Sequence, residues 1–324
     1  MNNVFAKTGS VKRLQCLCIF LLAPLVFSCG PVEYKEEESG EKLLVVTTTT
    51  QVTDMVRSLA GEQVEIFPLM GPGVDPHLYK PTAKDLAAFG GADLVFYHGL
   101  MLEGRMADLF SKASDSPSKT YAITSGIAHD RLLQPEEFEG HSDPHVWFDP
   151  EIWRDCVDVV RDALIGAHPE KRQFYLDNAK SLKEEIHAVH EWATARIGEL
   201  PKDRRRLVTS HDAFNYFGRA FGIEVRAVQG LSTTTEAGLA DRARMVDYVK
   251  KHGIKAIFVE SSVNQSIIRE IARETGAKVG GELFSDAMGE PGRMETSADG
   301  TTYDLGTWGG MLKHNVNAFV DAMK

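Results

Sequence analysis

The tripeptide Asp-Pro-His occurs twice in this chain of 324 residues, within "GVDPHLYKP" at 73–81 and within "SDPHVWFDP" at 142–150. Proline fixes its own φ angle and disfavours the helical conformation for the residue before it. Each histidine therefore follows a stiff turn outside regular secondary structure, and this turn restricts the direction in which its imidazole points. Two imidazoles held in this way, on His77 and His145, predict that both side chains bind the same ligand.

Two more residues with metal-binding side chains follow predicted strands in the second half of the chain. One comes directly after "RLVTS" and the other follows "GGELF". Ligands in open α/β proteins bind beyond the carboxyl ends of strands, so all four residues could meet at one site. Three imidazoles and one carboxylate suit tetrahedral Zn²⁺, and Mn²⁺ could bind with an expanded shell. The candidate ligands are His77, His145, His211 and Asp286.

These four residues also have ordinary alternatives. A histidine after Asp-Pro is commonly a polar loop residue, and Asp286 could cap a helix. Spacing alone leaves a metal site and these structural roles open. Glu260, at the end of "AIFVE", is predicted to accept a hydrogen bond from a ligand histidine and so fix its tautomer, the alternative being a solvated strand end. His98 could lie near the site, but a surface or loop position is expected.

Short apolar runs alternate with helical patterns along the whole chain, and this alternation predicts an α/β fold. Intervening segments such as "TEAGLADRARMVDYVKKHG" have the length and period of helices. The runs are expected to form two mainly parallel sheets covered by helices, one in each half. The expected strands span residues 43–50, 64–70, 93–99, 119–124, 206–212, 224–230, 256–260 and 277–284.

One long helix is predicted over residues 169–200, because a single glycine and no proline lie between Pro169 and Pro201. It would extend about 45 Å and join two lobes rigidly. The predicted domains are a lobe over 43–168, this helix and a lobe over 201–324, with the metal site between the lobes. The apolar stripe of the helix consists of Tyr175, Ala179, Leu182, Ile186, Val189, Ala193 and Ile197.

The N-terminus has the pattern of a bacterial lipoprotein signal. A largely apolar run at residues 14–27 follows basic residues, and it is shorter than the roughly 20 residues that span a bilayer. It ends in "LVFSC", which predicts removal of residues 1–28 and attachment of lipid to Cys29. Residues 29–42 would form a flexible tether. The mature protein is therefore expected in the periplasm or another extracytoplasmic space, anchored to a membrane through Cys29.

The net charge and the cysteine content argue against a nucleic-acid-binding protein and against an internal disulfide. The formal net charge of −10 argues against a nucleic-acid partner, which would require a basic face. Once Cys29 carries lipid and the signal is removed, Cys156 is the one cysteine left of four, so no internal disulfide is expected. The chain is long enough to form a hydrophobic core that replaces such bridges.

Five motifs, in this order along the chain, resemble those of the zinc/manganese ABC-transporter solute-binding lipoproteins, and of the TroA-like members in particular. They are "GPGVDPHLYKPT", "DPHVWFDP", "SHDAFNYFGRAFG", "AIFVESSVN" and "GGELFSDAMG". The resemblance extends from about Leu43 to the C-terminus. It implies two α/β lobes that are joined by one long helix and hold a metal between them.

The resemblance also implies a function. The protein would be a monomer that binds one Zn²⁺ or Mn²⁺ outside the cytoplasm and delivers it to an ABC permease and the ATPase of that permease for import. It would carry the metal and would not be an enzyme. The positions that match the metal ligands of the family are His77, His145, His211 and Asp286.

The resemblance leaves zinc and manganese open. Many manganese-selective relatives have a carboxylate at the position of His211, whereas zinc-selective relatives often carry a long histidine-rich loop between the first two ligands. The corresponding segment, "QPEEFEGHSDPH", is no such loop. Three nitrogen donors favour zinc over manganese.

Two other functions compete with metal transport. A zinc hydrolase would use the same ligands, but it needs an open coordination position and a general base within reach. The sequence contains no His-Glu-x-x-His, P-loop or Gly-x-Ser-x-Gly motif. An adhesin role for a surface lipoprotein is neither favoured nor excluded by the sequence.

Overall fold

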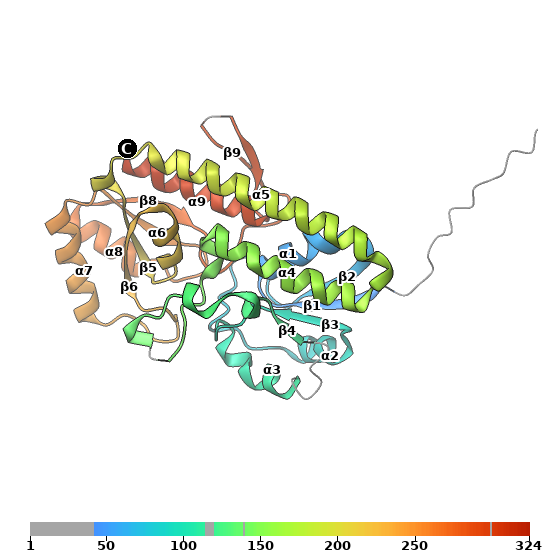
Figure 1. Cartoon of the computed structure of the whole chain (residues 1–324). Helices are drawn as coiled ribbons and strands as arrows, with labels where there is room; N and C mark the ends of the chain where they lie inside the picture. Colours follow the sequence, from blue (N-terminus) through green and yellow to red (C-terminus); the bar gives the residue numbers. More distant parts are fainter. Residues whose placement is uncertain (1–41, 114–119, 139, 299) are drawn as a thin grey trace, which may run out of the picture. The chain divides into compact units, whose positions relative to one another are not determined.

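The computed structural model describes residues 42–113, 120–138, 140–298 and 300–324 (Figure 1). The predicted signal peptide, the predicted lipidation site Cys29 and the predicted tether up to residue 41 lie outside these residues. Among the helices described, none is both long enough and apolar enough to cross a membrane.

The first half of the described chain forms a four-stranded parallel sheet with the order β2-β1-β3-β4. All four strands fall within predicted runs, whose interiors are rich in β-branched and aromatic residues. We call this sheet and its helices the N-terminal lobe. The strands are β1 (Leu43–Thr47), β2 (Val64–Pro68), β3 (Leu94–Tyr97) and β4 (Thr120–Ala122), and the helices are α1 (Thr50–Ala60), α2 (Ala83–Gly91), α3 (Ala107–Ala113) and α4 (Pro150–Ala167).

The second half, which we call the C-terminal lobe, also contains the four predicted strands. They form two parallel pairs, β5-β6 and β7-β8, and the expected single sheet is therefore divided. β5 and β7 lie in contact, and the Glu260 carboxylate at the end of β7 accepts from two backbone N–H groups of β5. The strands are β5 (Arg206–His211), β6 (Glu224–Gln229), β7 (Ala256–Glu260) and β8 (Lys278–Leu283), and the helices are α6 (Asn215–Phe221), α7 (Leu239–His252), α8 (Ser266–Thr275) and α9 (Trp308–Met323).

Several short elements were not expected from the sequence. β9 (Met294–Thr296) and β10 (Thr302–Asp304) form an antiparallel pair before α9. Single turns of 3₁₀ helix connect many of the longer elements, as is common in irregular segments. These turns span Gly61–Gln63, Gly104–Met106, Ile123–Gly126, His129–Arg131, Glu136–Phe138, Val146–Phe148, Pro169–Lys171 and Lys202–Arg204.

The long predicted helix is present as α5 (Arg172–Gly198), preceded by the 3₁₀ turn at Pro169–Lys171. At 1.5 Å per residue it is about 40 Å long. It packs against α1 and α4 of the N-terminal lobe and against α6 and α9 of the C-terminal lobe (Figure 1). Six of the seven predicted stripe residues are buried, and Leu182 is half-buried.

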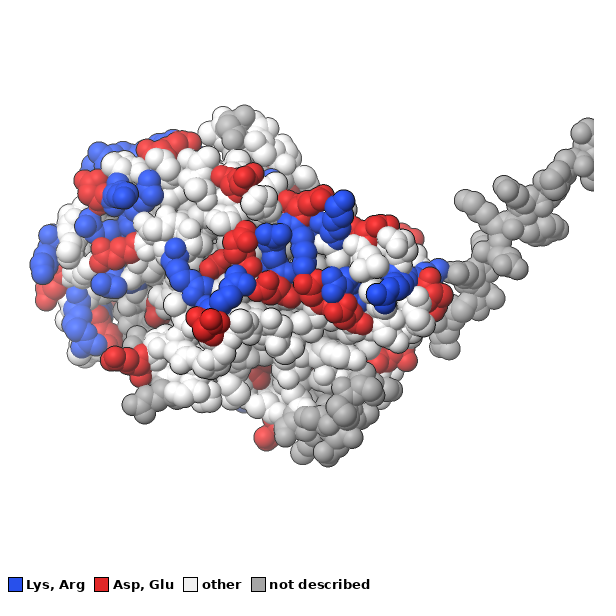
Figure 2. Space-filling model, in the orientation of Figure 1, with Lys and Arg blue, Asp and Glu red and all other residues white. Residues whose placement is uncertain are grey.

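Charged side chains of both signs are interspersed over the face of the molecule that carries α4 and α5 (Figure 2). Ion pairs join the two helices here, for example Lys183 to Asp158 at 2.6 Å. Beneath this face, one hydrophobic cluster includes buried residues of both lobes and of α5, and residues 42–324 form one compact unit. Direct hydrogen bonds also cross between the lobes, including Trp147 Nε1 to the Ser285 carbonyl (3.1 Å) and the Met288 N–H to Thr50 Oγ1 (2.9 Å).

Candidate metal site

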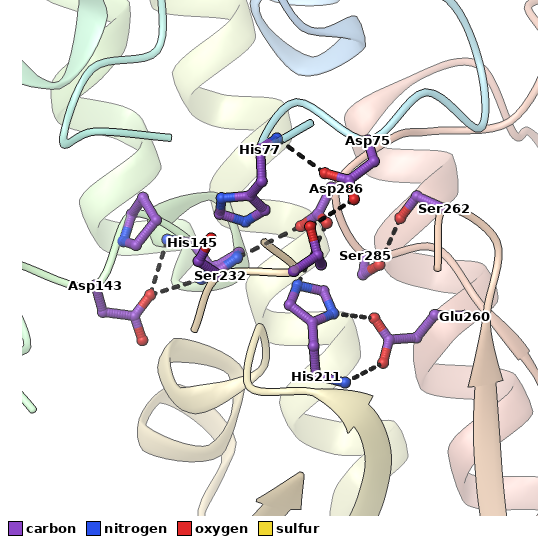
Figure 3. A network of polar contacts seen from close by, with 12 residues as sticks. Asp75, His77, Asp143, His145, His211, Ser232, Glu260, Ser262, Ser285 and Asp286 are labelled. Atoms are coloured by element: carbon purple, nitrogen blue, oxygen red, sulfur yellow. Dashed lines mark hydrogen bonds and ion pairs between the residues drawn. The ribbon is translucent and has the colours of Figure 1, made fainter. Parts of the chain in front are cut away.

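The structure brings the four candidate ligand residues together between the lobes (Figure 3). One potential ligand atom of each residue lies within 4.8 Å of the corresponding atoms of the other three, and all four side chains are buried. His77, His211 and Asp286 lie at or shortly after the carboxyl end of a strand, as expected for ligands in an α/β protein, whereas His145 lies in the irregular segment between β4 and α4. The preceding or containing strands are β2 for His77, β4 for His145, β5 for His211 and β8 for Asp286.

The two Asp-Pro-His turns are held in the same way. The N–H of His77 donates to Asp75 Oδ1 (2.8 Å), and the N–H of His145 donates to Asp143 Oδ1 (2.9 Å). These are turns in which an aspartate bonds to the backbone two residues later. Asp75 and Asp143 are functional residues that were not expected from the sequence, although an aspartate two residues before a histidine is the signal of such a turn.

Carboxylates contact the Nδ1 atoms of two of the histidines. Asp143 Oδ1 lies 2.8 Å from His145 Nδ1, and Glu260 Oε2 lies 2.5 Å from His211 Nδ1. The other oxygen of Glu260 accepts from the N–H groups of Ser210 (2.7 Å) and His211 (2.9 Å). Glu260 is fully buried, so the alternative of a solvated strand end is wrong.

His98 lies in a loop, which is one of its expected positions, but it is not on the surface. It follows β3 and is fully buried. Its Nε2 lies 2.6 Å from the carbonyl of Pro144, the residue before His145, and its ring contacts Trp147 edge-on. Burial lowers the pKa of His98 to about 3, so the ring is neutral and donates to this carbonyl. His98 thereby supports the backbone of the second Asp-Pro-His turn.

The inner atoms of the site lack hydrogen-bond partners among the described residues. They are the Nε2 atoms of His77, His145 and His211 and both carboxylate oxygens of Asp286. Asp286 Oδ1 lies 3.4 Å from His145 Nε2, and Asp286 Oδ2 lies 3.3 Å from His211 Nε2. Buried polar atoms without partners are rare and costly in native proteins, so this group calls for a ligand.

Electrostatic coupling shifts the pKa values of the site in opposite directions. Burial alone would lower the pKa of His145, but Asp143 and Asp286 raise it to about 9. Burial also opposes the charge on His211, yet Asp286 and Glu260 raise its pKa well above the usual value. Burial lowers the pKa of His77 to about 3, because Asp286 only partly opposes it. The pKa of Asp286 is held well below its usual value by His211 and His145, against the effect of burial.

The geometry and donor types fit a divalent transition metal. Bonds of about 2 Å in a tetrahedron place neighbouring ligand atoms about 3.3 Å apart, close to the separations of Asp286 from His145 and His211. Imidazole and carboxylate donors suit zinc, and manganese accepts the same set when the carboxylate binds through both oxygens. The arrangement can thus bind a divalent cation, and its one carboxylate offsets one of the two positive charges.

The chain matches one protein family over nearly its whole described length. Residues 45–322 match the family described as "Zinc-uptake complex component A periplasmic". Relatives include the manganese-binding lipoprotein MntA of Bacillus subtilis (strain 168), 37% identical over 315 residues that cover 94% of this chain and 99% of MntA. The zinc-binding protein TroA of Treponema pallidum (strain Nichols) is 37% identical over 318 residues, which cover 97% of this chain and 99% of TroA.

Solved structures agree with this match. The periplasmic zinc-binding protein TroA from Treponema pallidum superposes with a TM-score of 0.82 at 37% identity, covering 87% of this chain and 99% of that chain. A second TroA structure, from a study of metal-binding specificity, has a TM-score of 0.79 at 32% identity and covers 88% of this chain. The two-lobed α/β fold with one long helix is therefore shared with proteins of known structure.

Proposed function

The chain belongs to the family of the periplasmic component A of zinc-uptake complexes, and from this premise we propose that it captures a divalent transition metal outside the cytoplasm and delivers it to an ABC-type permease. The proposal rests chiefly on five buried ligand atoms from both lobes that have no hydrogen-bond partner among the described residues. The metal is the cargo of the protein, and the permease with its ATPase is the partner that takes it.

The proposed ligands hold one Zn²⁺ or Mn²⁺ per chain. His145 and His211 bind through Nε2, because each has a carboxylate at Nδ1 and its Nε2 faces Asp286. His77 also binds through Nε2, which is buried and has no hydrogen-bond partner among the described residues. Glu260 supports His211 from behind and fixes its tautomer. The proposed ligand set is His77, His145, His211 and Asp286.

The names of relatives include both metals, with manganese for MntA and zinc for TroA. Three imidazoles favour zinc, and the Irving–Williams order places zinc above manganese at a site of this kind. We therefore propose that the isolated protein binds zinc more tightly than manganese, whichever metal it carries in the cell.

The proposed chain organisation extends beyond the described residues. We propose that residues 1–28 are removed, that Cys29 carries lipid and that residues 29–42 tether a monomeric protein to the membrane. The proposed lobes span residues 43–168 and 201–324, with the connecting helix between them. The relative MntA is itself a lipoprotein by name, which supports the anchor.

The hydrolase alternative is weaker than transport. Four protein ligands complete a tetrahedral shell, whereas catalytic zinc sites usually keep one position for water. The family is one of uptake components, which also favours carriage over catalysis. No observation favours the adhesin alternative.

The test is metal binding by the lipid-free protein, residues 30–324. Zinc and manganese are loaded in competition, and bound metal is counted by mass spectrometry in wild type, His211→Ala and the control His187→Ala, whose side chain is 53% exposed. We expect about one equivalent in wild type and control, a strong loss in His211→Ala and a preference for zinc. Wild-type protein that takes up neither metal would refute the proposed function.

A further inference from the structure

The aspartate of each Asp-Pro-His turn has a second contact that the turn itself does not require. One oxygen of each carboxylate accepts from the backbone of its histidine, which leaves the other oxygen free to bond elsewhere. Asp75 Oδ2 accepts from Thr233 Oγ1 at 2.6 Å, and Asp143 Oδ2 accepts from Asn215 Nδ2 at 3.1 Å. The same two-sided arrangement thus occurs at both turns.

Both second contacts cross from one lobe to the other. Asp75 and Asp143 belong to the N-terminal lobe, Thr233 lies between β6 and α7, and Asn215 begins α6. The partners are 158 and 72 residues apart in sequence, so they meet only when the lobes are together. Each carboxylate therefore contacts a ligand histidine on its own lobe and a donor on the opposite lobe.

The surroundings make these hydrogen bonds strong. Thr233 is 8% exposed and Asp143 is fully buried, whereas Asp75 and Asn215 are half-buried, so each hydrogen bond has one partner that is shielded from water. Hydrogen bonds to an ionised acceptor are shorter and stronger than neutral ones. Asn215 also donates to Asp212 Oδ2 at 2.9 Å, which keeps its amide oriented toward the two carboxylates.

We propose that Asp75 and Asp143 are interlobe latches, positioning residues that hold His77 and His145 against the ligands of the C-terminal lobe and thereby slow metal release. The proposal rests on the proposed function, since it concerns release from the same site. Loss of one latch contact leaves all four ligands in place, but it lets the two lobes separate more often. The dissociation rate then rises while the association rate changes little, as is usual when a formed contact is weakened.

The experiment measures zinc dissociation from residues 30–324, which include the whole compact unit, by stopped-flow transfer to a chromogenic chelator. Thr233→Val and Asn215→Ala each remove one donor, and Thr233→Val keeps the shape of the side chain. We expect each to release zinc about ten-fold faster, the factor for one hydrogen bond to a charged group, and the double variant about a hundred-fold faster. The association rate is expected to stay within about three-fold of wild type.

Two controls separate the latch from general damage to the loop. Thr234→Val removes an exposed hydroxyl whose one hydrogen bond among the described side chains is to Ser232 of the same loop, at 3.0 Å, and this variant should release zinc like wild type. Thr233→Ser keeps the hydroxyl that Thr233→Val removes, and should therefore release zinc as slowly as wild type. Thermal melts report whether each variant is folded.

The outcomes distinguish the latch from the proposed function. Wild-type protein that binds no metal would overturn both. Wild-type protein that binds zinc, with Thr233→Val and Asn215→Ala releasing it at the wild-type rate, would overturn the latch alone. Equal acceleration of release by Thr234→Val, or release from Thr233→Ser as fast as from Thr233→Val, would also overturn it.

Discussion

At the scale of single residues, the hydrogen bond on one ring nitrogen of a histidine decides which nitrogen can bind a metal. Asp143 at His145 and Glu260 at His211 both occupy Nδ1, so Nε2 is directed into the site. These carboxylates also add negative charge next to a cation. The proposed ligands are therefore oriented by carboxylates that are not themselves among the proposed ligands.

Glu260→Gln tests whether the neighbouring carboxylate contributes to metal binding by His211. Glutamine keeps the size of the side chain but removes the charge that supports the imidazole, so we expect metal affinity to fall about 10- to 100-fold. Competition with a chelator measures the dissociation constant. The matched control is Glu282→Gln, an exposed glutamate at the neighbouring strand β8. Equal affinities of Glu260→Gln and wild type would contradict the assigned role.

Metal binding should also release protons at neutral pH. With a pKa of about 9 for His145 and a raised pKa for His211, both rings are protonated at pH 7, whereas His77, with a pKa of about 3, is not. Zinc must displace about two protons, so affinity should rise with pH. Calorimetry in buffers of different ionisation enthalpy gives the number released. Binding without proton release would show that the rings are already neutral.

At the scale of elements, α1 and α9 are joined by one buried carboxylate. Asp54 lies on α1, and its Oδ2 accepts from the N–H of Trp308 at the start of α9 (2.8 Å). A negative charge at a helix N-terminus is favourable. Burial nevertheless raises the pKa of Asp54 to about 6, with the Trp308 N–H and Arg57 opposing this and Glu185 and Asp304 adding to it.

Asp54→Asn should change how stability depends on pH. The pKa of Asp54 is higher in the folded protein than the usual 3.8, so the stability linked to its proton is present below about pH 4 and lost as pH rises through about 6. Asparagine still accepts from Trp308 without this cost. We expect equal stability at pH 4 and a gain of up to about 3 kcal/mol at pH 7, measured by urea unfolding. A loss at pH 7 would mean that the charge itself stabilises α9.

At the scale of the whole molecule, α5 and the shared hydrophobic core limit how far the lobes can move. The helix contacts both lobes along its length, and the core cluster is continuous between them. Wide hinge opening would break this packing, whereas small sliding shifts would not. Release of the metal is therefore expected to follow loosening of the interlobe contacts near the ligands.

Paired spin labels can measure this movement. Leu86→Cys on α2 and Leu239→Cys on α7 replace residues that are 48% and 85% exposed, and the native Cys156 is buried and will not react. The distance between labels should change by only about 1–2 Å when zinc is removed, as in shear-type motions. A change several times larger would contradict a rigid connection.

The strands and the long helix could be predicted from the sequence because their apolar periods are local. The ligand group was predicted from the repeated Asp-Pro-His turns together with the family resemblance. Spacing alone does not distinguish a metal site from ordinary loop and capping roles. Contacts between distant residues could not be predicted: Thr233 meets Asp75 across 158 residues. The division of the second sheet and the burial of His98 also depend on tertiary packing, which no local pattern encodes.

The fluorescence of Trp147 should report metal binding in the native protein. Its ring lies 5.3 Å from the ring of His145, and its Nε1 donates across the lobes to the carbonyl of Ser285, next to Asp286. A protonated imidazole quenches indole fluorescence, whereas an imidazole bound to zinc carries no such proton. Metal loading at pH 7 should therefore brighten the emission of the native protein, and Trp147→Phe should abolish most of that signal while metal uptake continues.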